Sequence, residues 1–299
     1  MTRVLVTGAG GFIGAHATAA LRSAGLDVHT VSRTTRATDD PRTHHPADLL
    51  DDPSSVVRKV RPDVLVHLAW DTTHGAFWTS PANELWLDAS TTMLREFLAG
   101  GGRHAVIAGT CAEYDWSAGQ QVLHEDSSPI RPVSLYGEAK VRLHERALEL
   151  AAEHDAGIGW ARIFFPYGPG EDPRKLVSSI ALSLLTNRPA QVRSGSLVRD
   201  YVYAQDAGQA LAAMATSRLA AAVNVGSGHA TPLAVIAQGV ADIVGRPDLL
   251  EIGHDEGADV NPVIADVSRL RDEVGYVAAT PLDRGLRATI AALSETAAT

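Results

Sequence analysis

The chain has 299 residues, 45% of them hydrophobic, and a formal net charge of −9. The length suits one large domain or two closely joined ones, and the acidic balance argues against nucleic acid as a partner. A single cysteine, Cys111, excludes an internal disulfide and a cysteine-based zinc site. The sequence has neither a basic leader with a long apolar segment nor eighteen consecutive apolar residues, so we expect a cytoplasmic protein without a membrane partner.

Residues 4 to 14, VLVTGAGGFIG, are an apolar run that ends in glycines and continues with helical spacing. This pattern predicts a buried strand, a turn and the start of a helix. The helix N-terminus offers unpaired N–H groups to an anion, and glycine lets a pyrophosphate approach the backbone. Gly8, Gly11 and Gly14 give the spacing G-x-x-G-x-x-G, with Ile13 where the general dinucleotide fingerprint needs glycine.

The string TGAGGFIG resembles the extended short-chain dehydrogenases/reductases, which are NAD(P)-dependent epimerases, dehydratases and reductases of sugars. Further matching segments extend the resemblance over almost the whole chain: HLA at 67–69, YGP at 167–169, RDYVYAQD at 199–206 and NVGSG at 224–228. The resemblance implies an NADP-binding Rossmann domain over 1–165, to which segments around 199–228 return. Residues 166–299 are then mainly a substrate-binding domain.

Apolar segments with strand character alternate with helical patterns along the chain. Strands are expected at 4–6, 26–31, 63–67, 105–109 and 157–163, and helices from Phe12 onward and at 82–99, 136–153 and 174–187. This alternation predicts an α/β fold with a doubly wound parallel sheet, in which ligands bind beyond the carboxyl ends of the strands. Residues 34–46, with the adjacent His44 and His45, are expected to be a loop. No metal site is expected, because metal-ligand spacings are absent.

Tyr136 and Lys140 lie four residues apart at the start of a long predicted helix, so both project from one helical face. Hydride addition to a carbonyl creates an alkoxide that needs a proton, and a phenol with a pKa of about 10 is a poor donor at neutral pH. A neighbouring ammonium lowers that pKa. The resemblance implies Tyr136 as general acid/base, Lys140 as its tuner and nicotinamide-ribose ligand, and Thr110 as the hydrogen-bond partner of the substrate oxygen.

The second predicted strand ends in Ser32-Arg33, with Arg36 close behind, where an acidic residue would accept from the adenosine ribose. A guanidinium attracts a 2′-phosphate, so the cofactor is predicted to be NADP rather than NAD. The alternative is that Arg33 stacks on adenine or faces water. The resemblance implies adenine contacts from Asp48 and Leu49. The expected cofactor-binding residues are Gly8, Gly11, Phe12, Ile13, Gly14, Ser32, Arg33, Asp48, Leu49, Leu68, Ala69, Tyr136 and Lys140.

Three residues are expected to meet the substrate. Trp70 begins an aperiodic stretch, residues 70–81, that is predicted to form a loop over the site, where its ring either stacks on a substrate or packs the loop down. Phe165 stands where nucleotide-sugar enzymes commonly carry an asparagine that binds the diphosphate, and an apolar ring there suits a deoxygenated sugar or an aromatic ketone. The resemblance implies that Arg199 meets the nucleotide diphosphate.

Cys111 and Ala112 replace the Asp-Glu pair of related sugar dehydratases, so dehydration is not expected and Cys111 is interpreted as a packing residue. The leading hypothesis is an NADPH-dependent ketoreductase that reduces the 4-keto group of a nucleotide-activated, dTDP-linked 6-deoxysugar. Alternatives are a nucleotide-sugar 4-epimerase, a reductase of a bulky ketone without a nucleotide, and a non-catalytic NADP-sensing regulator. The resemblance also implies a homodimer through the helix of Tyr136 and the helix at 82–99.

Overall fold

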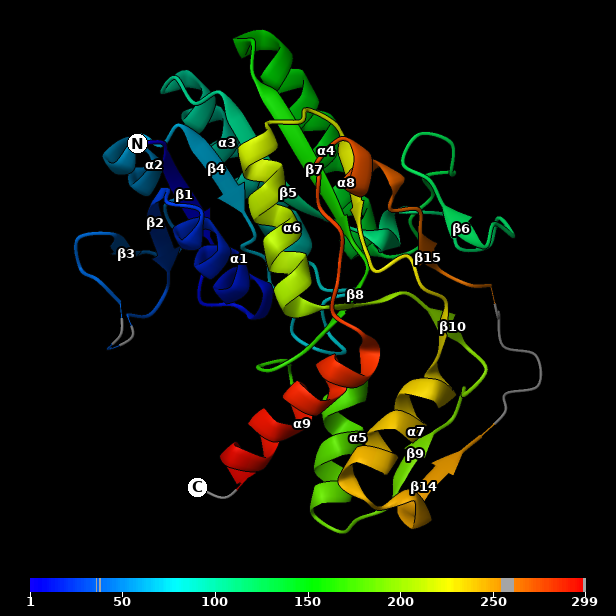
Figure 1. The fold of residues 1–299 in the computed structure, drawn as a ribbon. Coiled ribbons are helices and arrows are strands. Elements are labelled where there is room, and N and C mark those ends of the chain that lie inside the picture. The colour runs from blue at the N-terminus through cyan, green and yellow to red at the C-terminus, as the bar shows by residue number, and fades with distance from the viewer. Residues whose placement is uncertain (36, 38, 254–260, 298–299) are drawn as a thin grey trace.

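The computed structural model describes residues 1–35, 37, 39–253 and 261–297. Its centre is a seven-stranded parallel sheet in the order β12-β7-β5-β4-β1-β2-β3 (Figure 1). The strands are β1 (Arg3–Thr7), β2 (Asp27–Ser32), β3 (His44–Pro46), β4 (Val64–His67), β5 (His104–Thr110), β7 (Gly157–Ile163) and β12 (Ala222–Val225). The strand order reverses between β1 and β4, so the predicted doubly wound α/β fold is confirmed.

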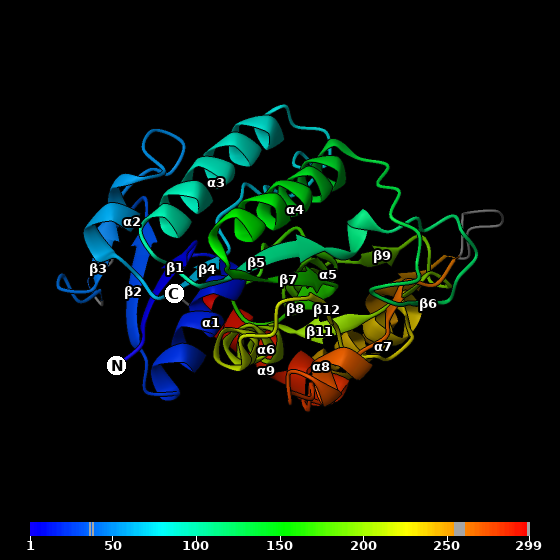
Figure 2. The same cartoon turned by 90° about the horizontal axis from the view of Figure 1, so that it is seen from above.

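Helices cover both faces of this sheet, because the strands are apolar on both sides. One face carries α2 (Ser55–Val60), α3 (Ala82–Ala99) and α4 (Leu135–His154). The opposite face carries α1 (Phe12–Ser23), α6 (Ala204–Ser217) and α8 (Ser268–Asp272). Figure 2 shows α3 and α4 side by side on one side of the sheet, with α1 and α6 on the other.

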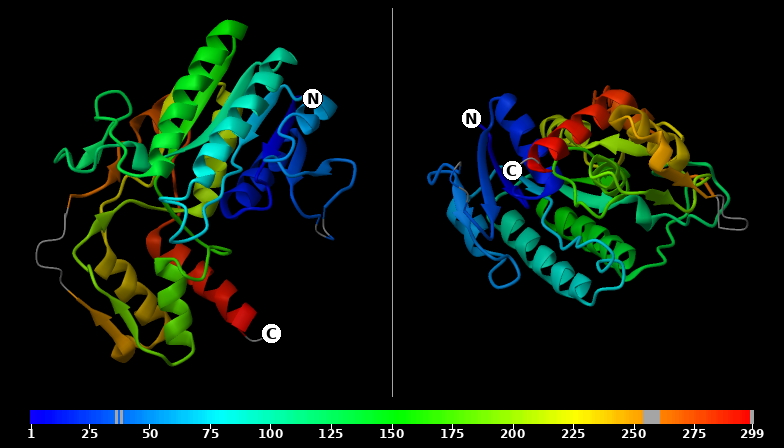
Figure 3. Two further views of the ribbon diagram at one scale, coloured as in Figure 1. Left: turned by 180° about the vertical axis from the view of Figure 1, so that it is seen from behind. Right: turned by 90° about the horizontal axis from the view of Figure 1, so that it is seen from below.

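A second hydrophobic core lies beyond the carboxyl ends of the strands, where α5, α7 and α9 pack together (Figure 3). Its elements are α5 (Leu176–Leu185), β9 (Ala190–Val192), α7 (Leu233–Val244), the 3-10 turn η2 (Pro247–Leu249), β14 (Leu250–Ile252) and α9 (Leu282–Ala297). Short strand pairs join this lobe to the sheet: β8 (Phe165–Tyr167) with β11 (Tyr201–Tyr203), β10 (Val198–Arg199) with β13 (Thr231–Pro232), and β6 (Val122–Leu123) with β15 (Ile264–Ala265).

The last helix, α9, completes the second lobe. A Cβ on Gly285 would lie 2.2 Å from the Tyr167 hydroxyl oxygen, so only glycine lets the helix approach this ring. The Tyr167 hydroxyl also donates to the Leu282 carbonyl oxygen at 3.4 Å. Leu286 and Ile290 are buried in the same core.

The loop prediction for His44 and His45 was wrong. Both side chains are buried on β3, the last strand of the sheet on that side. His44 Nδ1 lies 3.0 Å from the Thr30 hydroxyl, and His45 Nε2 lies 3.0 Å from His29 Nδ1. A three-residue strand is too short to display an apolar alternation, so its pairing with β2 left no sequence signal. In the described ranges, no group of three or more His, Cys, Asp or Glu side chains could hold a metal ion.

The helix predicted at 174–187 is shorter and spans α5 alone. Among the helices of the described residues, none combines the length and apolarity needed to cross a membrane.

Candidate active site

The glycine loop connects β1 to α1 in a conformation that larger residues would disturb. Gly8 has φ of +68°, and a Cβ on it would lie 2.7 Å from the Ala69 amide nitrogen. A Cβ on Gly14 would lie 2.0 Å from the Gly8 carbonyl oxygen. Gly11 is the N-cap of α1, which has no side-chain cap and no acidic residue in its first turn. The first-turn N–H groups and the positive end of the helix dipole therefore remain available to an anion.

Thr7 ties the end of β1 to the end of β4. Its hydroxyl oxygen accepts from the amides of Leu68 and Ala69 at 3.1 and 3.2 Å and lies 2.6 Å from His67 Nδ1. The other ring nitrogen of His67 lies 2.8 Å from the Ser90 hydroxyl of α3. Burial lowers the pKa of His67 to about 3, so its imidazole is neutral. The HLA segment is thereby fixed beside the glycine loop.

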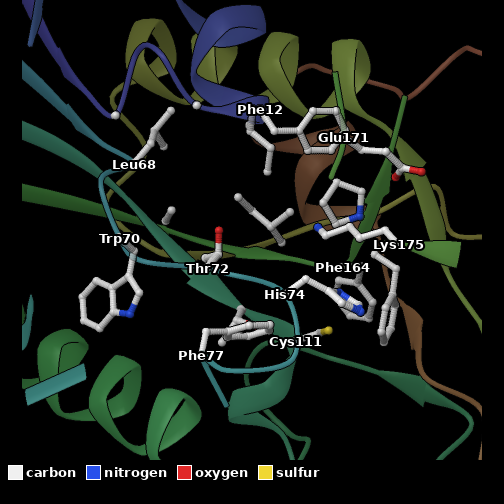
Figure 4. Close-up of a pocket in the computed structure, with 18 of the residues that line it drawn as sticks. Phe12, Leu68, Trp70, Thr72, His74, Phe77, Cys111, Phe164, Glu171 and Lys175 are labelled. Atoms are coloured by element: carbon white, nitrogen blue, oxygen red, sulfur yellow. The ribbon is translucent and has the colours of Figure 1, made fainter. Parts of the chain in front are cut away.

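A cavity of about 470 Å³ opens where the carboxyl ends of the sheet meet α5 (Figure 4). The predicted site residues that line it are Gly8, Gly11, Phe12, Ile13, Gly14, Leu68, Ala69, Trp70, Thr110, Tyr136 and Phe165. The cavity also has lining residues that we did not predict as site residues: Thr72, His74, Phe77, Trp78, Cys111, Phe164, Glu171, Lys175 and Tyr201. Four of these lie in the stretch 70–81 that was expected to cover the site.

Thr110 and Tyr136 meet at the cavity wall. The Thr110 hydroxyl oxygen accepts from the Ala112 amide at 3.2 Å, which leaves its hydrogen free to be donated. Burial raises the pKa of Tyr136, and a hydrogen bond from Thr110 partly offsets this rise. The rings of Phe77 and Trp78 stand edge-on to the Tyr136 ring, at centroid distances of 4.9 and 5.9 Å. The aromatic surroundings therefore keep the phenol protonated at neutral pH.

Lys140 lies behind Trp70 and does not line the cavity. Its ammonium donates to the Ala108 carbonyl oxygen at 2.8 Å and sits 3.7 Å from the Trp70 ring centroid. Burial lowers the pKa of Lys140 to about 7, against the opposing charge of Glu113. Lys140 is 5.9 Å from the Tyr136 ring centroid, and the pKa of Tyr136 lies above its ordinary value because burial of the phenol dominates.

Trp70 packs on Lys140 and on Trp86, whose ring centroid is 6.1 Å away, and its indole N–H donates to Asn83 Oδ1 at 2.8 Å. Figure 4 shows its ring directed away from Glu171 and Lys175. Two roles were considered for Trp70, stacking on a substrate and packing the loop down, and these contacts are of the packing kind.

The far end of the cavity is charged. The Lys175 ammonium lies 5.7 Å from the Phe12 ring centroid, beside the start of α1. Glu171 accepts from the Ser178 amide at 2.8 Å. Burial raises the pKa of Glu171 and lowers that of Lys175, because both charges are partly withdrawn from water. Lys175 is one of only three lysines in the chain, which is the one signal by which the sequence could have drawn attention to it.

The predicted adenosine contacts lie outside the cavity. The Ser32 hydroxyl donates to the Thr34 carbonyl oxygen at 2.7 Å, and Arg33 is exposed at the end of β2. Asp48 accepts from the Leu50 amide at 3.0 Å, and Leu49 is buried in the core. Arg36 lies outside the described residues.

Arg199 also stands apart from the cavity lining. Its guanidinium donates to the carbonyl oxygens of Val198 and Asn261 at 2.8 and 2.9 Å. It lies 5.3 Å from the Trp116 ring centroid and 5.8 Å from that of Phe165. Arg199 therefore sits behind Phe165, which itself faces the cavity.

Comparison with known proteins agrees with this fold. The model of the NAD dependent epimerase/dehydratase family matches residues 4–226, and the chain belongs to that family. The UDP-glucose 4-epimerase of Mycolicibacterium smegmatis is 25% identical over 310 residues, covering 96% of this chain and 97% of the relative. The UDP-glucuronic acid decarboxylase 1 of Xenopus tropicalis is 24% identical over 303 residues, covering 96% and 71%.

Among solved structures, MoeE5 in complex with UDP-glucuronic acid and NAD is similar, with a TM-score of 0.83 and 27% identity. The alignment covers 98% of this chain and 99% of MoeE5. The resemblance to the extended short-chain dehydrogenases/reductases is thus confirmed.

Proposed function

We propose that the chain is an NAD(P)-dependent enzyme that transfers hydride at C4 of a nucleotide-linked sugar. The observation that carries this proposal is that Thr110 and Tyr136 line one cavity together with the glycine loop. Names of the relatives support a nucleotide sugar, since the M. smegmatis protein is a UDP-glucose 4-epimerase and MoeE5 was solved with UDP-glucuronic acid.

The loop geometry fits the pyrophosphate of a dinucleotide. Backbone atoms already occupy the positions where a Cβ on Gly8 or Gly14 would lie, so this loop conformation requires glycine. At the start of α1, which has no side-chain cap, N–H groups remain open to an anion. Phe12 and Ile13 would supply those amides, because the Gly11 amide already donates to the Gly8 carbonyl oxygen at 2.9 Å. Leu68 and Ala69 would lie beside the cofactor. When bound, the nicotinamide would supply or accept the hydride.

The chain's own residues handle the proton. In the reducing direction, hydride forms a C–H bond at C4 and the carbonyl π electrons move to oxygen, which takes the proton of the Tyr136 phenol. The Thr110 hydroxyl donates to the same oxygen and stabilises its developing charge. In the oxidising direction, the phenolate takes the proton of the sugar hydroxyl. The Lys140 ammonium stabilises that phenolate through its positive charge.

Two reactions use this chemistry. A 4-epimerase runs it in both directions on one substrate and consumes no cofactor, and the relatives named UDP-glucose 4-epimerase favour it. A 4-ketoreductase for a dTDP-linked 4-keto-6-deoxysugar consumes one NADPH per turnover. Arg33 at the end of β2 and the apolar wall of Phe164 and Phe165 favour this second candidate.

The test is a substrate panel with the purified chain. UDP-glucose and UDP-galactose are incubated without added reductant, and their interconversion identifies an epimerase. Oxidation of NADPH by a dTDP-4-keto-6-deoxysugar, with NADH in parallel, identifies the reductase. Failure of every nucleotide sugar in both assays would refute the proposal. Reduction of neutral ketones alone would point to the alternative without a nucleotide, and Arg199→Ala would then leave the rate unchanged.

A further inference from the structure

Glu113 is a completely buried carboxylate that has no role in the hydride and proton transfers proposed above. It ends the 3-10 turn η1 (Cys111–Glu113), directly after Thr110. Its Oε1 accepts from the Thr110 backbone amide at 2.8 Å, and both carboxylate oxygens lie 3.0 Å from the Trp160 indole nitrogen. Its Oε2 accepts from Arg162 Nε at 2.8 Å. Four hydrogen bonds therefore fix this anion beneath the cavity wall.

Glu113 and Lys140 bind the same short stretch of β5 from its two ends. Lys140 binds the carbonyl oxygen of Ala108, while Glu113 binds the amide of Thr110. Between them lies Gly109, where a Cβ would come within 2.3 Å of Trp160 Nε1 and 2.6 Å of Glu113 Oε1. The strand end that presents the Thr110 hydroxyl is thus held by an ammonium on one side and a carboxylate on the other.

Titratable groups from several elements surround Glu113 and Lys140. Arg162 of β7 is the direct ion-pair partner of Glu113 and also donates to the Tyr114 hydroxyl at 3.1 Å. His144 of α4 stacks on Trp160 at 4.5 Å, and its pKa is lowered to about 4 by burial and then by Arg162, so it is neutral. The remaining titratable groups that face the pair are Tyr136 of α4, His67 of β4 and the Cys111 thiol.

The negative charge of Glu113 acts on Lys140 in the direction that catalysis needs. Burial lowers the pKa of Lys140 to about 7, and Glu113 raises it against that burial. Arg162 balances part of the Glu113 charge, yet the carboxylate remains the anion that counters the buried Lys140 ammonium. Without it, burial alone would act on Lys140.

We propose that Glu113 is a positioning residue that fixes the Thr110 backbone and supplies the counter-charge which keeps Lys140 an ammonium. This inference rests on the proposed roles of Thr110 and Lys140. It concerns how the strand end is organised and is independent of which sugar is the substrate.

The first experiment needs no substrate. The chain has only three lysines, Lys59, Lys140 and Lys175, so 13C-labelled lysine gives three NMR titrations, and Lys140→Met assigns the relevant one. Glu113→Gln keeps an acceptor for the Thr110 amide and removes the charge. We expect the Lys140 midpoint to fall by about one pH unit, while Lys175 serves as the internal control and stays unchanged. An unchanged Lys140 midpoint in folded Glu113→Gln would overturn the proposal.

Two further variants separate charge from packing. Trp160→Phe removes one donor to Glu113 and retains the carboxylate, so it lowers the melting temperature without moving the Lys140 midpoint. Glu113→Asp keeps the charge but shortens the reach to the Thr110 amide, so kcat falls about tenfold with an unchanged midpoint and unchanged cofactor affinity. This variant also decides the positioning role if Glu113→Gln does not fold, since wild-type kcat in Glu113→Asp contradicts it. If no nucleotide sugar is turned over, the proposed function fails, while the NMR titration still tests the counter-charge.

Discussion

Gly14→Ala tests the geometry of the cofactor loop. The new Cβ would lie 2.0 Å from the Gly8 carbonyl oxygen, whereas non-bonded heavy atoms sit about 3.5 Å apart. The loop and α1 must therefore separate by roughly 1 to 1.5 Å. Overpacking of this kind costs about 1–3 kcal/mol of stability. The displacement also removes at least one N–H bond to the pyrophosphate, which costs about 1.5–3 kcal/mol of binding free energy, or about 10- to 150-fold in Kd.

Fluorescence titration with NADPH and NADH measures this loss, and thermal unfolding measures the stability of each variant. Gly25→Ala is the matched control, because Gly25 has φ of +76° and nothing within 4 Å of an added Cβ. It costs about 1–2 kcal/mol through its left-handed backbone but leaves the cofactor loop intact. A wild-type Kd in Gly14→Ala, or an equal rise of Kd in both variants, would refute the reasoning.

Four other outcomes can be checked. Tyr136→Phe should leave cofactor affinity intact and abolish turnover, and near-normal turnover would remove Tyr136 from the chemistry. Burial lowers the pKa of Lys140 to about 7 and raises that of Tyr136, so both side chains are protonated at lower pH. The kcat for reduction should therefore fall as the pH rises through about 7. A steady increase of kcat up to pH 9 would contradict this. Arg33→Ala should weaken NADPH about tenfold and leave NADH unchanged if the guanidinium meets a 2′-phosphate, whereas equal effects on both cofactors would exclude that contact. The exposed Leu85 of α3 and Leu148 of α4 lie on the faces expected to dimerise, so light scattering should find a dimer that Leu85→Glu with Leu148→Glu dissociates; a monomeric wild type would refute the dimer.

The sequence predicted the parallel sheet well because buried strands carry their signal locally. Runs such as VLV at 4–6 and the glycines that follow are apolar and specific in spacing, and neither depends on a distant partner. His44 and His45 show the opposite case, because their burial depends on pairing with β2 rather than on a pattern of their own.

The site was predictable where a helix or strand sets the spacing and not where side chains from several elements meet. Thr110 and Tyr136 come together because strand end and helix start are fixed by the fold. The position of Trp70 over Lys140 and the bonds from Glu113 to Trp160 and Arg162 join residues up to 70 positions apart. Residue types alone do not indicate such long-range contacts. For this reason stacking on a substrate was considered for Trp70, and Glu113 was not singled out.

The contact of Gly285 with Tyr167 has a consequence for the order in which the protein is made. The central sheet receives its last strand when residue 225 leaves the ribosome, so that layer can form early in synthesis. The second lobe must wait for α9, because Leu286, Ile290 and the face of Tyr167 have their partners only when residues 282–297 arrive. During that interval the faces of α5 and α7 that later pack on α9 are an exposed apolar surface on the nascent chain.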